Sequence, residues 1–210
     1  QHLPRFTGRK WLFRKIDAWL EDPNGDKVFW LTGDPGSGKT AIASKLSSGH
    51  PEIAAFHICR YGDRLKADPQ RAVLSITWQL ATQLPDLMKK LNRIKNLEEV
   101  CQLSDPATIF ERLVIDPLHN NIQHPKKHPS VILIDGLDEA TVDGRNELCE
   151  FLASEMERTP EWVRFLLTSR QEPEVTQPLQ AYSPIHLDNT SRENREDIKT
   201  YLMHQLAPFE

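Results

Sequence analysis

One stretch of the chain, residues 28–46, constrains the fold more than any other. It opens with Val28-Phe29-Trp30-Leu31, bulky residues that favour a strand buried on both faces. The next eight residues, Gly33-Asp34-Pro35-Gly36-Ser37-Gly38-Lys39-Thr40, fit the pattern G-x-x-x-x-G-K-[S/T] without a mismatch. Residues 41–46 then have the composition of a helix start. A strand, a glycine-rich loop and a helix in this order predict a phosphate-binding loop (P-loop) rather than a chance glycine-rich turn.

The chemistry of this loop follows from its residue types. Gly33, Gly36 and Gly38 have no Cβ, so the backbone can turn tightly and approach an anion closely. The N–H groups of such a loop and the N-terminus of the helix after it attract phosphate. Lys39 is predicted to reach the β- and γ-phosphates, and the Thr40 hydroxyl is predicted to hold Mg²⁺.

Composition narrows the class of protein and its partners. The chain has 210 residues, enough for one large α/β domain, and a formal charge of −4. That charge gives no chain-wide attraction to nucleic acid or to an anionic membrane, and the longest aliphatic run, Val131–Ile134, is too short to span a bilayer. The three scattered cysteines are expected to be free thiols in a reducing, cytoplasmic compartment. Because the chain starts at Gln1 and stops in an expected helix, we expect a domain excised from a larger protein.

The rest of the chain alternates between strand and helix patterns. Further strands are expected at residues 53–59, 131–134, 162–167 and 185–187, and helices at 11–20, 69–97 with a break at 84–85, 105–117, 144–157 and 193–206. Such alternation predicts a parallel sheet with both faces covered, which binds ligands at the carboxyl ends of its strands. The five tryptophans fall on expected core faces: Trp11, Trp19, Trp30, Trp78 and Trp162.

A second group of candidate residues follows two later strands. Asp135 ends a hydrophobic strand, where a P-loop protein needs a carboxylate near Mg²⁺. Asp138 and Glu139 follow within four positions, and such acids beside a metal-held phosphate suit general-base or water-orienting work. Arg170 ends the next strand and is placed to stabilise a γ-phosphate. The sequence alone leaves two alternatives open: the acids could form an ordinary acidic loop at a strand end, and Arg170 could be an ordinary surface arginine.

These motifs resemble those of a known family. The run V-I-L-I-D-G-L-D-E-A at residues 131–140 resembles the second signature of NACHT domains, which are P-loop NTPases of the STAND class of signalling switches, related to AAA+ ATPases. Leu166-Leu167-Thr168-Ser169-Arg170 resembles the sensor strand of that family. Phe6-Thr7-Gly8-Arg9 is similar to its adenine-contacting segment, and residues 194–202 to the start of its small helical domain.

The resemblance implies a fold and domain boundaries. We expect an α/β fold, a three-layer P-loop NTPase whose mostly parallel sheet has the additional-strand, AAA+-like order. In that order the sensor strand lies between the P-loop strand and the Asp135 strand. Residues 1–188 would form the NACHT nucleotide-binding domain, and residues 189–210 the truncated beginning of the small helical domain.

The resemblance also implies roles for particular residues. Thr40 and Asp135 would serve Mg²⁺, and Lys39 and Arg170 would act in catalysis. Asp138 or Glu139 would polarise the attacking water, and we prefer Asp138 because its spacing is that of the family. The nucleotide-binding set would comprise Thr7 and Gly8 near adenine, with Gly33, Pro35, Gly36, Ser37, Gly38, Lys39, Thr40 and Ala41 around the phosphates.

The function implied is a switch with ATP or ADP and Mg²⁺ as its ligands. Slow hydrolysis would reset it, and the ATP state would self-associate through NACHT–NACHT contacts in a larger protein, commonly one of innate immunity or programmed cell death. ATP rather than GTP rests on the resemblance, since the chain has no guanine-reading N-K-x-D run. A non-hydrolysing, nucleotide-bound scaffold is the main alternative. A small-molecule kinase is a third, although the sequence shows no arginine-rich lid.

Overall fold

The centre of the molecule is a parallel sheet whose strands are buried on both faces. The computed structural model describes residues 9–119, 128–188 and 199. The strands are β1 (Val28–Gly33), β2 (Ile53–Ile58), β3 (Ser130–Asp135), β4 (Val163–Ser169) and β5 (Ile185–Leu187). Their order is β2-β3-β4-β1-β5, and all the pairings are parallel. The predicted parallel sheet is confirmed, and β4 lies between β1 and β3 as expected.

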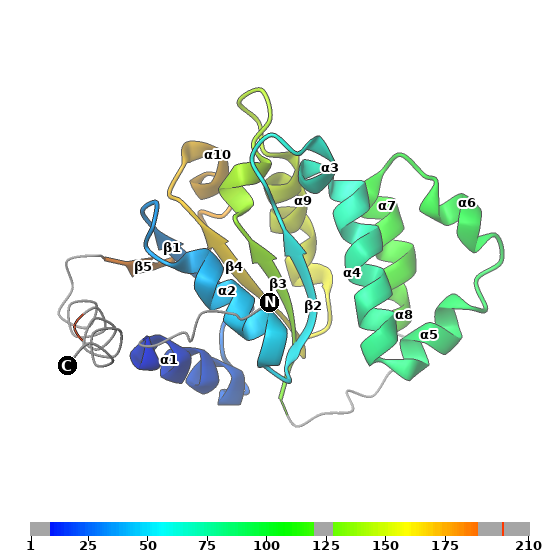
Figure 1. Cartoon of the computed structure of the whole chain (residues 1–210). Coiled ribbons are helices and arrows are strands. Elements are labelled where there is room, and N and C mark those ends of the chain that lie inside the picture. Colours follow the sequence, from blue (N-terminus) through cyan, green and yellow to red (C-terminus); the bar gives the residue numbers. More distant parts are fainter. Residues whose placement is uncertain (1–8, 120–127, 189–198, 200–210) are drawn as a thin grey trace, which may run out of the picture.

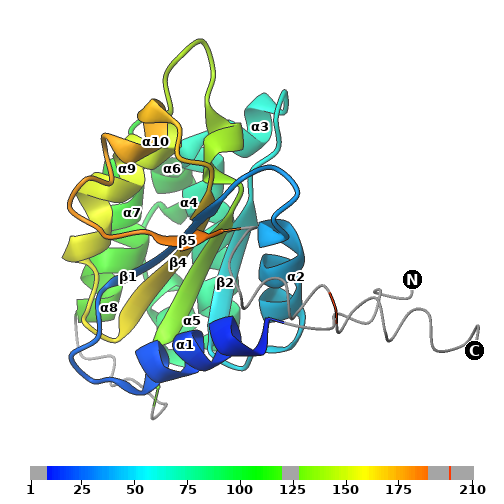
Figure 2. The same cartoon turned by 90° about the vertical axis from the view of Figure 1, so that its left-hand side faces the viewer.

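Helices cover both faces of this sheet and give the three expected layers (Figures 1 and 2). On one face lie α1 (Lys10–Glu21) and α2 (Lys39–Gly49), whose apolar residues pack against alternate residues of β1, β3 and β4. The larger layer packs on the other face. It includes α4 (Pro69–Gln83), α5 (Pro85–Leu91), α7 (Pro106–Phe110), α8 (Asp116–His119), α9 (Glu147–Glu155) and α10 (Pro173–Thr176).

The larger layer contains short elements in addition to the predicted helices. The expected break at residues 84–85 separates α4 from α5, because Pro85 lacks the N–H that would continue the first helix. Short helices that the sequence analysis did not anticipate are α3 (Arg64–Ala67), α6 (Leu97–Cys101) and α10. A π-helical turn (Glu111–Ile115) joins α7 to α8, and 3₁₀ turns form at Leu137–Ala140 and Met156–Arg158.

The expectation that Trp78 lies in the core is wrong. Its side chain is 68% exposed, whereas the other tryptophans are buried or partly buried. The buried face of α4 is formed by small and aliphatic residues such as Ala72, Ile76 and Leu80. Trp78 follows Ile76 by two residues, which is roughly 200° around a helix, so it lies on the opposite side.

Two expectations fall outside the described residues, except for residue 199. They are the helix at 193–206 and the small helical domain expected at 189–210. In the part that the structure does describe, none of the helices combines the length and apolar character needed to cross a bilayer.

Candidate functional site

The P-loop begins where β1 ends and leads directly into α2. Gly36 and Gly38 have φ angles of 78° and 94°, a left-handed conformation that side chains with a Cβ rarely adopt. A Cβ on Gly33 would lie 2.7 Å from Ser37 Oγ and 3.0 Å from Leu187 Cβ. The sequence therefore folds into a compact loop that only glycines at these positions allow, with the N-terminus of α2 opening onto it.

Lys39 is folded back onto the loop that carries it. Its Nζ donates to the carbonyl oxygens of Gly33, at 2.6 Å, and Asp34, at 3.1 Å. Burial lowers the pKa of Lys39, and the nearby Asp138 carboxylate opposes this change. The ammonium group is thus held at the mouth of the P-loop by neutral carbonyls, which a phosphate can replace as a stronger, charged partner.

Asp135 lies at the end of β3, close to the P-loop. The Thr168 hydroxyl of β4 donates to Asp135 Oδ1 at 2.6 Å and accepts the Gly136 N–H at 2.9 Å. Burial raises the pKa of Asp135, and hydrogen bonds from Thr168 and then Thr40 oppose the rise. The Thr40 hydroxyl and the Asp135 carboxylate therefore meet near Lys39. Both supply oxygen donors, which Mg²⁺ prefers as ligands.

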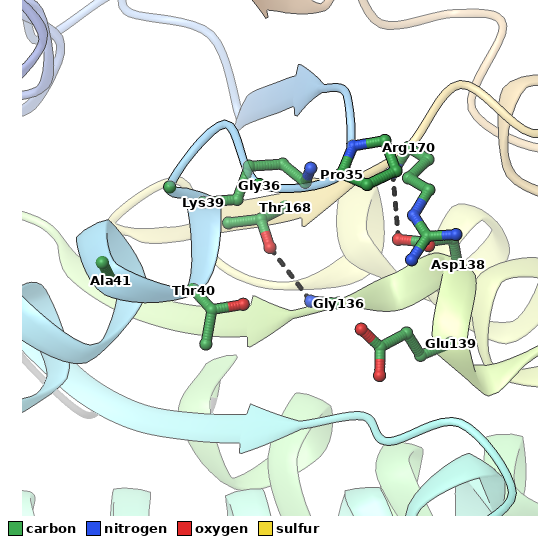
Figure 3. A pocket seen from close by; sticks show the side chains of 11 residues that line it. Pro35, Gly36, Lys39, Thr40, Ala41, Gly136, Asp138, Glu139, Thr168 and Arg170 are labelled. Carbon is green, nitrogen blue, oxygen red and sulfur yellow. Dashed lines mark hydrogen bonds and ion pairs between the residues drawn. The ribbon is translucent and has the colours of Figure 1, made fainter.

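Asp138 and Glu139 diverge within a single 3₁₀ turn, Leu137–Ala140. The Asp138 carboxylate accepts the main-chain N–H of Arg170 at 2.9 Å and forms an ion pair with its guanidinium at 3.3 Å. Figure 3 shows Glu139 pointing away from that pair, on the side of Thr40. Its Oε2 accepts the main-chain N–H of Tyr61 at 3.0 Å. The two acids thus have different partners, and only Asp138 is bound to the arginine.

These elements line an open cavity of about 250 Å³. Of the predicted site residues, nine line it: Pro35, Gly36, Gly38, Lys39, Thr40, Ala41, Asp138, Glu139 and Arg170 (Figure 3). Gly33, Ser37 and Asp135 lie buried beside it, and Thr7 and Gly8 fall outside the described residues. The sheet order explains the convergence, since β1, β4 and β3 are neighbours and their carboxyl ends meet at one edge.

The structure adds residues that the sequence analysis did not select. Thr168 and Gly136 also line the cavity. Arg9 donates from Nη2 to the Ser37 carbonyl at 2.7 Å, which ties the start of α1 to the P-loop. Both side chains belong to motifs noted above, Arg9 to F-T-G-R and Thr168 to the strand that ends in T-S-R, so their neighbours in sequence were the available signal.

Comparison with known proteins gives the family. Residues 8–170 match the model of the family described as "Nephrocystin 3, N-terminal", a span that holds both halves of the cavity. The chain belongs to this nephrocystin 3 N-terminal family. It is also 22% identical over 171 residues to the vegetative incompatibility protein HET-E-1 of Podospora anserina. That alignment covers 79% of this chain but only 12% of the relative, so the chain spans a small part of that protein's length.

A solved structure shows the same fold. The Aeropyrum pernix ORC1 protein, determined in complex with DNA, superposes with a TM-score of 0.50 at 16% identity. The match covers 95% of this chain and 50% of the ORC1 chain. At this identity the likeness concerns the fold alone. Together with the intact P-loop, it shows that this member of the nephrocystin 3 N-terminal family has the fold of a P-loop NTPase.

Proposed function

We propose that this domain is a NACHT-type switch of the STAND class that binds ATP and ADP with Mg²⁺ and hydrolyses ATP slowly. The observation that carries the proposal is the meeting of Lys39, Asp138, Glu139 and Arg170 around one cavity. A P-loop lysine, two acids and an arginine are the parts that phosphoryl transfer to water requires. The family match and the likeness to HET-E-1 support a nucleotide-dependent domain within a longer protein.

The residues of the P-loop would bind the phosphates. Backbone N–H groups from Gly36 to Ala41 and the Lys39 ammonium would hold the β- and γ-phosphates. The Thr40 hydroxyl and the Asp135 carboxylate would hold Mg²⁺, which when bound neutralises charge on the phosphate oxygens. Thr7 and Gly8 are proposed to lie near the adenine.

We further propose a division of labour between the two acids. Asp138 is 6% exposed and paired with Arg170, so it would orient the arginine toward the γ-phosphate. Glu139 lines the cavity free of that pair, so it would take a proton from the attacking water. The water oxygen bonds to the γ-phosphorus, the bond to the β–γ bridging oxygen breaks, and ADP and phosphate leave. This assignment departs from the preference for Asp138 that family spacing implies.

A switch follows if the two nucleotides favour different arrangements of the protein. The γ-phosphate contacts of Lys39 and Arg170 would supply the differential affinity that such a shift requires. We propose that the ATP state self-associates in the full-length, cytoplasmic protein, with residues 1–188 as the nucleotide-binding domain and 189–210 beginning a small helical domain. The DNA of the ORC1 structure has no proposed counterpart here, since the net charge of −4 offers no general attraction to it.

Calorimetric titration with ATP and Mg²⁺ tests the binding proposal. The substitution Lys39→Ala removes the charge that would face the phosphates, so ATP affinity should fall by about 100-fold or more. Lys45→Ala is the matched control, because Lys45 is an exposed lysine of the same helix. Equal affinities in wild type and Lys39→Ala would refute the P-loop assignment.

A non-hydrolysing scaffold remains the second candidate, and one observation favours it. The Asp138 carboxylate already accepts the N–H of Arg170 and pairs with its guanidinium. If Glu139 cannot act as the base, bound nucleotide would have a structural role only. Steady phosphate release that disappears in Glu139→Gln supports the enzyme, whereas no release from nucleotide-saturated wild type supports the scaffold.

A further inference from the structure

The exposed apolar surface of this domain is concentrated at one edge of the sheet. In the part of the chain that the structure describes, the large hydrophobic side chains that are exposed are Phe56, Ile58, Tyr61, Leu65 and Trp78. Tyr61 is 83% exposed and Trp78 is 68% exposed. We call these five residues the edge surface. Scattered exposed hydrophobics need no explanation, but exposed hydrophobics confined to neighbouring elements at one edge of a sheet indicate an interaction site.

The five residues lie on elements that contact one another. β2 is the end strand of the sheet, and α4 packs beside it (Figure 1). The Gln79 side-chain amide of α4 donates to the Phe56 carbonyl at 2.8 Å and accepts the Phe56 N–H at 3.0 Å. Trp78 is therefore next to a residue in direct contact with β2. The neighbouring residue of β2, His57, holds α3: its ring and the Lys66 carbonyl lie 2.8 Å apart. This contact places Leu65 of α3 next to β2.

The contact with Gln79 also limits how a partner can bind. It satisfies both hydrogen-bonding groups of Phe56, so this residue of β2 is not available to pair with an added strand. Recognition at the edge surface would therefore depend on side chains rather than on extension of the sheet.

The charges around the edge surface indicate the chemistry of the partner. Arg60, Arg64 and Lys66 are exposed, lie between its residues in the sequence, and form no ion pair with any residue that the structure describes. The carboxylate of the intervening Asp63 is occupied as the N-cap of α3, where it accepts the N–H groups of residues 65 and 66. Apolar side chains among unpaired cations complement a segment that carries both acidic and apolar residues.

We propose that the edge surface is a docking site for an acidic, apolar segment of a partner protein. Phe56, Tyr61 and Trp78 carry rings, but Ile58 and Leu65 add aliphatic surface, and this mixture suits the apolar side chains of a protein segment. The net charge of −4 also opposes a nucleic-acid partner.

The docking site is connected to the candidate active site. The Tyr61 N–H donates to Glu139 at 3.0 Å, and Ile58 pairs in register with Asp135. A segment that contacts Tyr61 would therefore alter the hydrogen bond from the Tyr61 N–H to Glu139 and change the rate of ATP hydrolysis. This connection rests on the proposed function, whereas the docking site itself does not.

Selection from a random peptide library displayed on phage tests the docking site. Selected peptides should be enriched in acidic and apolar residues. Their affinity should fall about tenfold or more for the double variant Tyr61→Ser/Trp78→Ser and for Arg64→Glu, and stay unchanged for Lys10→Glu, an exposed lysine of α1. The two serine variants replace side chains that are mostly exposed, so the domain should stay folded.

Three results would overturn the docking proposal. The first is a set of peptides without acidic enrichment, or with unchanged affinity for the double variant. The second is binding of a labelled oligothymidylate that the double variant loses. The third is a wild-type dimer in sedimentation velocity that the double variant does not form, which would assign the surface to a second copy of the chain.

The link to the active site has its own measurement. A selected peptide at saturation should change the rate of phosphate release from wild type about twofold or more, and an unchanged rate would refute the link. Nucleotide titration of the same preparation separates the proposals. Failure to bind ATP would refute the proposed function and leave the peptide result standing.

Discussion

A lysine and an arginine lie at each end of the sheet, and their partners differ between the two ends. At the amino end, Lys27 Nζ donates to the carbonyls of Thr159 and Pro160, and the Arg164 guanidinium donates to those of Trp19 and Asp22. At the carboxyl end, Lys39 also donates to carbonyls, but Arg170 pairs directly with the Asp138 carboxylate beside an open cavity.

Exposure separates the two arginines. Arg164 is 4% exposed, and it stacks over the Trp19 ring at 5.6 Å, whereas the Arg170 side chain is 45% exposed. The cations at the amino end therefore have permanent partners that join α1 to β1 and β4. Those at the carboxyl end have partners that a ligand can replace. The comparison teaches that a buried arginine bound to main-chain carbonyls joins elements of the fold, whereas a half-exposed arginine paired with a carboxylate lies where a ligand can reach it.

The largest expected effect comes from removing the buried arginine. Arg164→Ala would remove the guanidinium from the carbonyls of Trp19 and Asp22, of which Asp22 keeps the Gly25 N–H as a donor, and the free energy of unfolding should fall by about 3 kcal/mol. Chemical denaturation measures this change. ATP affinity of the folded fraction should not change, because the residue lies at the far end of the sheet. A loss of affinity without a loss of stability would contradict the structural role assigned to the amino end.

The next effect concerns Thr168, which supports Asp135 at the carboxyl end. Thr168→Val removes the hydroxyl that serves Asp135 and Gly136, so the free energy of unfolding should fall by about 2 kcal/mol. The pKa of Asp135 should rise further, because one of the hydrogen bonds that oppose its rise is lost. Titration of ATP affinity against Mg²⁺ should show a weaker dependence on the metal. Thr168→Ser keeps the hydroxyl and should restore that dependence, and an unrestored response would contradict the role of the hydrogen bond.

Arg170 gives a smaller effect that is specific to the γ-phosphate. Arg170→Ala should lower ATP affinity about tenfold and leave ADP affinity unchanged, because only ATP carries the γ-phosphate toward which Asp138 would orient the arginine. The free energy of unfolding should change by less than about 0.5 kcal/mol, since the guanidinium is half exposed. Equal losses for ATP and ADP would show that Arg170 does not distinguish the two nucleotides.

The carboxyl end was largely predictable from the sequence, and the amino end was not. The P-loop and the strand ending in Asp135 are local patterns, and a parallel sheet brings the carboxyl ends of neighbouring strands together. The pairing of Asp138 with Arg170 depends on a 3₁₀ turn after β3, which spacing alone does not specify. The bonds from Arg164 cross more than 140 positions of sequence, and no local pattern encodes them.

The error at Trp78 has a different cause. An apolar face fixes which side of a helix is buried only if every large apolar residue belongs to that face. On α4 the smaller residues form the buried face, and the tryptophan lies opposite. A rule that places aromatic residues in the core therefore fails where a surface is used for binding, which is the role proposed for the edge surface.

The smallest effect is a pH dependence that comes from Lys27 at the amino end. Burial lowers the pKa of Lys27 from 10.5 to about 8. Between these values the unfolded chain binds more protons than the folded one, so the free energy of unfolding should rise with pH across this window. The penalty of burying the charge is complete below pH 8 and is relieved above it.

The Lys27 prediction is checked by denaturation of wild type and Lys27→Met at intervals from pH 8 to 10.5. Wild type should gain about 1 kcal/mol relative to the variant across the range, a figure reduced by solvent screening of a partly exposed group. Parallel pH profiles would show that the amine has the same pKa in both states. Burial of the charged Lys27 would then cost no stability, and the contrast between the two ends would rest on Arg164 and Arg170.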